Sequence, residues 1–157
     1  MLSHVDKKNR PAMVDVSAKE ITSRVATACS VVRLPKKVLE QVNKDEIFTK
    51  KGPVFQTAII AGTMAAKKTS ELIPFCHPIG LEACAIDIVI NADQKVVITC
   101  AVRTQHKTGV EMEALVGAST AALTVYDMCK ALSHEIVIEE TKLLEKKGGK
   151  SGDYRAL

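Results

Sequence analysis

The spacing of hydrophobic and polar residues predicts strands and helices that alternate along most of the chain. Residues 24–34 alternate with a period of two, which indicates a strand, and Pro35 begins a short helix that reaches about residue 42. Gly52-Pro53 opens a second helix over residues 53–68. The alternating runs 81–90 and 95–104, joined by residues 91–94, indicate an antiparallel hairpin. A helix over residues 111–130 and a strand over residues 134–145 complete the pattern.

This order of elements predicts the ferredoxin-like α+β fold. In a βαββαβ chain, the helices pack together on one face of an antiparallel sheet. We expect a single domain over residues 1–157, because a chain of this length can bury a core and no linker or repeat interrupts it. The two ends, residues 1–12 and 147–157, are rich in charge or glycine, and we expect them to be flexible.

The helix over residues 111–130 has an unusual distribution of charge. Residues 114–126 carry no charged side chain. A helix that is apolar on all sides needs cover on two sides, and a single sheet covers only one. We therefore expect a second subunit to pack against this helix.

Composition narrows the class of protein. The five cysteines are odd in number and include no C-x-x-C pair, which argues against a disulfide framework and for a reducing, cytoplasmic location. The first thirty residues contain no signal-peptide core, and no uncharged run approaches the roughly 18 residues of a membrane span. A net charge of +4 with only 3% aromatic residues does not favour nucleic-acid binding, but it suits a small anionic substrate.

Asp127 and Lys130 are the first candidates for chemistry, because they stand three residues apart at the end of the uncharged helix. One interpretation is an ordinary ion pair on an exposed last turn. The other is a desolvated acid and base whose pKa values are tuned for proton transfer. The pattern alone does not choose between them.

Cys76 and His77 form a second candidate, in a loop stiffened by Pro74 and Pro78. Adjacent side chains rarely bind one metal, and no second Cys/His pair has ligand spacing, so we expect no metal site. A histidine that contacts a polar ligand is the favoured interpretation, and a loop histidine with one backbone hydrogen bond is the alternative.

Two basic segments could bind an anion. Lys50 and Lys51 precede the predicted helix start at Gly52-Pro53, where backbone N–H groups favour an anion, although a solvated loop would have the same sequence. The tail "GGKSG" is not a P-loop, because its first glycine is missing and too little chain follows for the required helix. A Gly/Lys tail that closes over phosphate groups stays an alternative.

Several long motifs occur together in one order: "MVDVSAK", "KKGPVF", "AGTMAAKKTSELIPFCHP", "KTGVEMEAL", "YDMCKA" and "GGKSGD". With these motifs the chain resembles the cyclic pyranopterin monophosphate synthase family, the C proteins of molybdenum cofactor biosynthesis. The resemblance runs from residue 13 to the tail. Phe75 departs from the pattern, since leucine is common there, which affects the shape of a pocket more than its chemistry.

The resemblance implies an activity and an assembly. The family converts (8S)-3',8-cyclo-7,8-dihydroguanosine 5'-triphosphate, here called cyclised dihydro-GTP, to cyclic pyranopterin monophosphate and diphosphate. The enzyme is a homohexamer, a trimer of dimers, with a ferredoxin-like subunit and active sites at the dimer interface. No cofactor or bound metal is implied, and the resemblance leaves open whether a divalent cation accompanies the triphosphate.

The resemblance also implies roles for particular residues. Asp127 matches the catalytic aspartate and Lys130 the general acid/base, with Lys51 as a further catalytic lysine. The residues that hold or surround substrate correspond to Phe75, Cys76, His77, Met112 and Glu113, with Glu111, Arg24, Lys67 and Lys146 nearby. Two rival hypotheses are a nucleotide-sensing regulatory module of the same fold and a metal hydrolase that uses Cys76 and His77. A sensor would bind guanine nucleotides without turnover, and a hydrolase would lose activity on chelation.

Overall fold

A computed structural model describes residues 5, 8 and 10–156 of the chain. Residues 1–4, 6–7, 9 and 157, which belong to the predicted flexible ends, lie outside the described residues. Near the carboxyl end, Lys147 belongs to a long strand and Tyr154–Arg155 form a short one. The mobility of the two ends stays a prediction.

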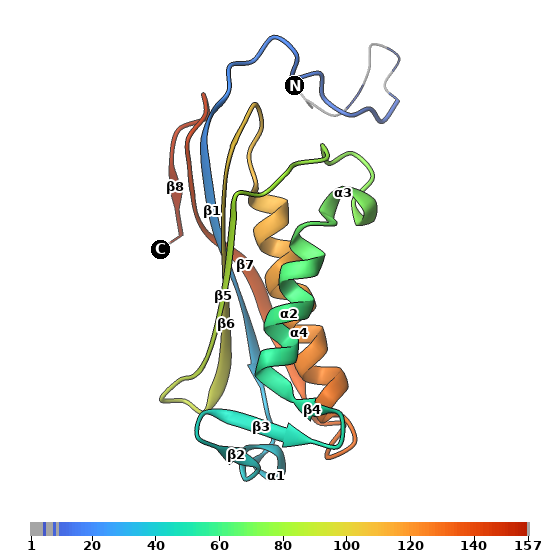
Figure 1. The fold of residues 1–157 in the computed structure, drawn as a ribbon, viewed down its shortest axis with the longest axis vertical. Helices are drawn as coiled ribbons and strands as arrows, with labels where there is room; N and C mark the ends of the chain where they lie inside the picture. The colour runs from blue at the N-terminus through green and yellow to red at the C-terminus, as the bar shows by residue number, and fades with distance from the viewer. Residues whose placement is uncertain (1–4, 6–7, 9, 157) are drawn as a thin grey trace.

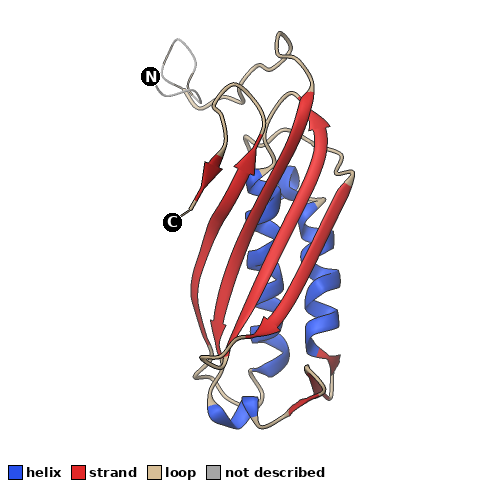
Figure 2. Cartoon of the chain, turned by 90° about the vertical axis from the view of Figure 1, so that its left-hand side faces the viewer, coloured by secondary structure: helices blue, strands red, loops and turns tan. Residues whose placement is uncertain are grey.

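A five-stranded antiparallel sheet forms one layer of the molecule. Its strands are β1 (Thr22–Arg33), β5 (Ala83–Ile90), β6 (Lys95–His106), β7 (Val137–Lys147) and β8 (Tyr154–Arg155). They stand in the order β5-β6-β1-β7-β8, and every neighbouring pair is antiparallel. Two long helices cover one face of this sheet (Figures 1 and 2). The predicted α+β fold, with an antiparallel sheet and helices on one face, is confirmed.

Helices α2 (Val54–Ala66) and α4 (Glu111–Cys129) lie beside each other on one face of the sheet. Glycine makes their close approach possible. A Cβ atom on Gly62 would lie 2.7 Å from the carbonyl oxygen of Gly117 and 2.5 Å from Cδ1 of Ile86, so no larger residue fits without a shift. The two helices therefore touch backbone to backbone near their middles.

Several shorter elements differ from the prediction. Helix α1 (Lys36–Leu39) is shorter than expected, and Gly52–Pro53 form strand β4 rather than the start of α2. This strand pairs with β3 (Glu46–Thr49), which in turn pairs with β2 (Val42–Asn43). The small sheet β2-β3-β4 and helix α3 (Thr69–Leu72) were not predicted. The small sheet lies at the lower end of the molecule in Figure 1, beside the last turn of α4.

The core lies between the large sheet and the two helices. Val96, Ile98, Cys100 and Val102 alternate along β6 and are almost completely buried. The side of α4 that carries small side chains faces the sheet and is buried. Its residues are Ala114, Gly117, Ala118, Ala121 and Val125. The opposite side of α4 is less covered, and Leu123 is 59% exposed. Within one chain, the uncharged helix is thus buried on one side only.

Two further observations concern the class of protein. None of the helices in the described residues is long and apolar enough to cross a membrane. All five cysteines carry free thiols in the structure.

Candidate active site

Helix α4 separates the predicted site residues into two groups. Glu111, Met112 and Glu113 begin the helix, whereas Asp127 lies in its last turn and Lys130 directly follows it. Because an α-helix rises about 1.5 Å per residue, Glu113 and Asp127 lie about 21 Å apart along the axis. A general acid or base must come within hydrogen-bond reach of the reacting atom. One chain therefore cannot bring both groups to the same atom.

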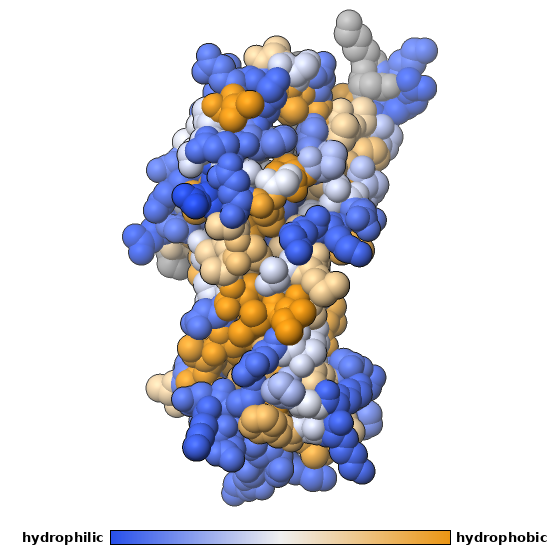
Figure 3. All heavy atoms as spheres, viewed as in Figure 1, coloured by the Kyte–Doolittle hydropathy of each residue, from blue (hydrophilic) through white to orange (hydrophobic). Residues whose placement is uncertain are grey.

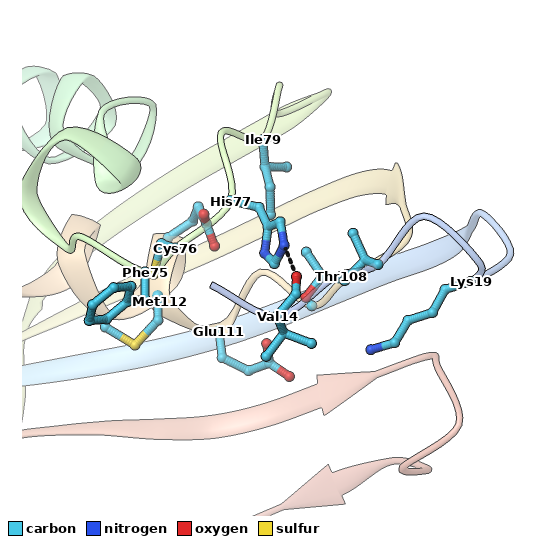
Figure 4. Close-up of a pocket in the computed structure, with 12 residues that line it drawn as sticks. Val14, Lys19, Phe75, Cys76, His77, Ile79, Thr108, Glu111 and Met112 are labelled. Carbon is cyan, nitrogen blue, oxygen red and sulfur yellow. Dashed lines mark hydrogen bonds between the residues drawn. The ribbon is translucent and has the colours of Figure 1, made fainter. Parts of the chain in front are cut away.

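The first group lines a cavity of about 300 Å³, the His77 pocket, at the amino-terminal end of α4. The loop that follows α3, the first turn of α4 and residues 14–19 form its walls (Figure 4). Phe75 and Met112 lie toward one end of the pocket in this view and Lys19 toward the other. The structure brings six predicted substrate-binding residues together here: Phe75, Cys76, His77, Glu111, Met112 and Glu113.

His77 is held in one orientation. Its Nε2 lies 2.7 Å from the backbone oxygen of Val14, which can only accept, so Nε2 carries the proton (Figure 4). In the neutral imidazole this leaves Nδ1 as an acceptor. The backbone hydrogen bond of the alternative interpretation is present, and contact of this histidine with a polar ligand stays a prediction. The bond additionally holds the segment around Val14 against the pocket.

Glu113 is the most deeply buried ionisable side chain of this pocket, only 3% exposed. Burial raises the pKa of Glu113 to about 7, and the neighbouring carboxylate of Glu111 adds to the rise. The protonated and charged forms of Glu113 therefore both exist near neutral pH. Burial, and then the charge of Glu113, raises the pKa of Cys76, which stays a thiol at neutral pH.

The metal-hydrolase hypothesis requires a group of metal-ligating side chains around Cys76 and His77. Within the part of the chain that the structure describes, no three Cys, His, Asp or Glu side chains are grouped so that they could hold a metal ion. A structural zinc site needs four ligands, and a catalytic one needs three. Glu111 and Glu113 line the His77 pocket with Cys76 and His77, but among the described residues no three of these side chains form such a group.

A second cavity of about 500 Å³, the Arg24 pocket, adjoins the first. The two share Lys19, Thr108, Gly109 and Glu111. Two carboxyl-bearing residues, Glu20 and Glu111, line the Arg24 pocket, against five cationic ones: Lys19, Arg24, Lys107, Lys146 and Lys150. The excess of positive charge makes this pocket suitable for an anion.

Sequence reasoning anticipated only part of the Arg24 pocket. Arg24 and Lys146 were predicted, and Nζ of Lys146 lies 3.9 Å from a carboxylate oxygen of Glu111. Lys150 belongs to the Gly/Lys tail that was kept as an alternative phosphate contact, whereas Lys19 and Lys107 were missed, although each stands inside one of the motifs that carry the resemblance. Thr22 also lines this pocket, but its hydroxyl oxygen is buried, without a hydrogen-bond partner among the described residues.

Lys67 stands apart from both pockets. It caps the carboxyl end of α2 and is exposed. Lys67 influences Cys84 instead. A hydrogen bond with the thiol of Cys100 lowers the pKa of Cys84 to about 7, and a hydrogen bond with Thr63 and the positive charge of Lys67 add to this effect. The position of Lys67 in a substrate site stays a prediction.

The second group of predicted residues forms the Asp127 cluster, made of Lys51, Asp127 and Lys130. Each carboxylate oxygen of Asp127 accepts from one ammonium group, Oδ1 from Lys130 and Oδ2 from Lys51, both at 2.7 Å. Hydrogen bonds from Lys130 and then Lys51 lower the pKa of Asp127 to about 2. The hydrogen bond with Asp127 raises the pKa of Lys130.

Asp127 and Lys130 are accessible to water in the single chain. The side chains of all three residues in the Asp127 cluster are about half exposed. They stand at the carboxyl end of α4, at the end of the molecule where the small sheet lies (Figure 1). Within one chain they form the exposed ion pair of the first interpretation, extended by Lys51.

The predicted anion site at the start of α2 is wrong. The carboxylate of Glu46 occupies the backbone N–H groups there: Oε1 accepts from Phe55 at 2.8 Å and Oε2 from Gln56 at 3.2 Å. An acidic side chain of strand β3 thus satisfies the helix start, as the helix dipole favours. Lys51 points to Asp127 instead.

Comparison with known proteins places this geometry in a family. A model of the MoaC family matches residues 13–149. A cyclic pyranopterin monophosphate synthase of Xanthomonas oryzae pv. oryzae is 56% identical over 149 residues, which cover 95% of this chain and 90% of that protein. The synthase of Brevibacillus brevis is 48% identical, covering 98% of this chain and 94% of its own length.

A longer relative contains the same region as one part. The molybdenum cofactor biosynthesis bifunctional protein of a Synechocystis species is 54% identical over 155 residues, which are 96% of this chain but only 45% of that protein. Because the family match spans most of the chain and the relatives align along nearly all of it, the chain belongs to the MoaC family.

Proposed function

We propose that the chain is a cyclic pyranopterin monophosphate synthase, which converts cyclised dihydro-GTP to cyclic pyranopterin monophosphate and diphosphate in molybdenum cofactor biosynthesis. Membership of the MoaC family and the activity named for its relatives support this assignment. The observation that carries it is the pair of adjoining pockets at the start of α4. One pocket is lined by carboxyl groups and suits a guanine-derived ring, and the other is basic and suits a triphosphate.

The ring of the substrate occupies the His77 pocket in this proposal. Guanine-type rings carry N–H donors, and the carboxylate oxygens of Glu111 and Glu113 can accept hydrogen bonds from them. Since the pKa of Glu113 is about 7, it can also donate a proton near neutral pH. Phe75, Cys76 and Met112 supply the apolar part of the wall.

The triphosphate occupies the Arg24 pocket. Arg24 and Lys146 contribute positive charge, together with Lys19 and Lys107. Cations here also favour departure of diphosphate when a ribose oxygen attacks the α-phosphate, because negative charge develops on the leaving group.

The Asp127 cluster acts, we propose, in the site of a neighbouring subunit. Three exposed hydrophobic side chains on the helical layer support a subunit interface: Ile60 (61%), Met64 (51%) and Leu123 (59%). Figure 3 shows hydrophobic residues gathered across the middle of one face, with hydrophilic residues toward both ends. Packing of such faces buries the Asp127 cluster and brings it to the pockets of the partner. A homohexamer with active sites at dimer interfaces satisfies this arrangement.

Within the complete site, Asp127 orients two ammonium groups and Lys130 transfers protons. An ammonium held by Asp127 is charged and can donate a proton to the substrate. Exclusion of water by the partner favours its neutral form for the return step. Lys51 shares the same carboxylate, and Lys67 adds charge from the end of α2. We also propose a cytoplasmic location, which suits five free thiols.

Turnover tests the proposal directly. The purified protein is incubated with cyclised dihydro-GTP, and diphosphate and pterin are quantified. Equal amounts of both products are expected, and the Asp127→Asn variant should form neither at a comparable rate. Tight binding of the nucleotide without products would instead favour the sensor hypothesis. Repeating the assay with a chelator shows whether a divalent cation accompanies the triphosphate.

A further inference from the structure

The guanidinium of Arg24 is directed at the protein backbone. Its Nε donates to the carbonyl oxygen of His106 at 3.2 Å, Nη2 to that of Lys107 at 3.3 Å and Nη1 to that of Gly148 at 3.4 Å. Two of these carbonyls precede α4 and the third follows β7. The side chain of Arg24 therefore joins the loop before α4 to the carboxyl-terminal segment.

Residues 148–153 form a closed turn, here called the C-terminal turn. The N–H of Gly148 donates to Oδ1 of Asp153 at 3.1 Å, and that of Gly152 donates to the carbonyl of Gly149 at 3.3 Å. Beyond the turn, β8 pairs antiparallel with β7. The turn is thus the connection of a hairpin, built by its own hydrogen bonds.

Two glycines allow this turn to pack on Arg24. Gly148 and Gly149 have φ values of 91° and 86°, which side chains rarely adopt. A Cβ atom on Gly148 would collide with the carbonyl oxygen of Ser23, and one on Gly149 would collide with the guanidinium of Arg24. Space for the guanidinium exists only because residue 149 has no side chain.

The C-terminal turn forms part of the Arg24 pocket. Gly149, Lys150 and Ser151 line the cavity together with Lys19 and Lys107 from other segments. Lys150 supplies an ammonium group and Ser151 a hydroxyl, and both can donate to phosphate oxygens. These two residues lie beyond residue 149, where the match to the MoaC family ends.

We propose that Arg24 is a positioning residue, which fixes the C-terminal turn as a wall of its pocket so that Lys150 and Ser151 contact the phosphate groups of the substrate. Arg24 fixes the turn through three carbonyl groups, and this role is separate from the positive charge that it adds to the pocket. This inference rests on the proposed function for the identity of the ligand. The position of the turn can be measured without any substrate.

The Arg24→Lys variant separates positioning from charge. Lysine keeps the positive charge but cannot reach three carbonyls with a planar fork. Amide hydrogen exchange over residues 148–152 should become at least about fivefold faster in this variant. KM for cyclised dihydro-GTP should rise at least about fivefold, while kcat stays within about threefold of wild type. Arg103→Lys, at an exposed site on β6, is the matched control and should change neither.

Two further variants test the turn itself. Gly149→Ala keeps every charge, and it should speed exchange and raise KM as Arg24→Lys does. Lys150→Ala should raise KM and leave exchange of the other turn amides unchanged. An Arg24→Lys protein with wild-type exchange and KM would overturn the proposal, as would a Gly149→Ala protein with wild-type exchange. If wild type makes no product, the proposed function fails, whereas the exchange measurements still decide the positioning role.

Discussion

At the scale of single residues, Asp127 organises the proposed chemistry. It accepts from Lys51 and Lys130 at 2.7 Å each, and so fixes two ammonium groups with one carboxylate. Glu113, at the other end of α4, differs because it is buried and its pKa is raised. The two carboxyl groups therefore differ in protonation: Asp127 is held in its charged form, whereas Glu113 can be protonated near neutral pH.

Replacement of Lys130 tests whether its proton or only its charge is needed. Lys130→Ala should lower kcat by roughly 10²–10⁴-fold, the usual loss for a general acid or base. Lys130→Arg should fail as well, because a guanidinium stays protonated and cannot transfer a proton. Diphosphate release is measured with the oligomeric state checked for each variant. A near wild-type rate for Lys130→Arg would show that Lys130 supplies charge alone.

The raised pKa of Glu113 predicts a pH dependence of stability. Between its ordinary value of 4.5 and about 7, the folded chain holds this proton while the unfolded chain has lost it. The contribution of Glu113 to the free energy of unfolding is therefore full below this range and falls as pH rises through it. Glu113→Gln, which cannot titrate, should gain stability relative to wild type across this interval.

Urea unfolding of both proteins at several pH values, at one fixed protein concentration, measures this difference. Above the folded pKa the difference should become constant. A difference that does not change with pH would mean that Glu113 titrates normally in the folded chain.

At the scale of elements, the packing of α2 on α4 sets the distance between the two layers of the fold. Gly62 and Gly117 face each other where the helices touch. Any side chain at these positions must displace backbone or a buried sulfur, since a Cβ atom on Gly117 would lie 2.6 Å from Sγ of Cys100. The helix pair also carries site residues at both ends, so its geometry controls both.

Gly62→Ala and Gly117→Ala should each destabilise the chain by about 1–3 kcal/mol, the usual cost of overpacking a core. Gly80→Ala is the matched control, because a Cβ atom there meets nothing within 4 Å. Urea unfolding compares the three variants with wild type. Equal stability of Gly62→Ala and Gly80→Ala would contradict the close approach of the helices.

Long periodic segments made the large elements predictable from sequence. Buried and more exposed residues alternate along most of strand β6, and α4 contains the long uncharged run 114–126. Strands β2 and β4 contain two residues each, too few for a period, so the small sheet was missed. The capping of α2 by Glu46 was missed because Glu46 belongs to strand β3. The position of β3 beside the helix depends on pairing between strands, which a local sequence pattern does not show.

The sequence predicted which residues line the candidate site better than it predicted how these residues are arranged in space. Most substrate-binding residues named from motifs do meet at the start of α4. The pattern gave no measure of exposure, so it did not choose between an exposed and a desolvated ion pair at Asp127. The separation of Glu113 from Asp127 follows from helix rise alone and was available in the sequence.

At the scale of the whole molecule, charge collects where the substrate is proposed to bind. Lys146→Ala should raise KM about tenfold or more, as expected for a lost charge-assisted hydrogen bond. Raised salt should weaken substrate binding in wild type, and less so in this variant. Lys37→Ala, on α1, lines neither pocket and is the control. Binding that is insensitive to Lys146 and to salt would move the triphosphate elsewhere.

The oligomer is the largest claim, because one chain holds the two halves of the site about 21 Å apart. Sedimentation of the wild-type protein should give a hexamer. A stable monomer at micromolar concentration would leave the Asp127 cluster without a partner pocket. Assembly alone does not establish a shared site, however, and a functional measurement is needed.

Complementation between two inactive variants tests the shared site most directly. Glu113→Gln disables one end of α4 and Lys130→Ala the other, and each variant alone should lose at least about 100-fold in rate. The two are unfolded together and refolded in equal amounts, and hybrid formation is verified with a tag on one variant. In a two-fold symmetric hybrid, one of the two sites receives both intact ends. We predict recovery of about a quarter of wild-type activity, because half of the randomly formed dimers are hybrids. Verified hybrids as inactive as the separate variants would contradict a site built from two subunits.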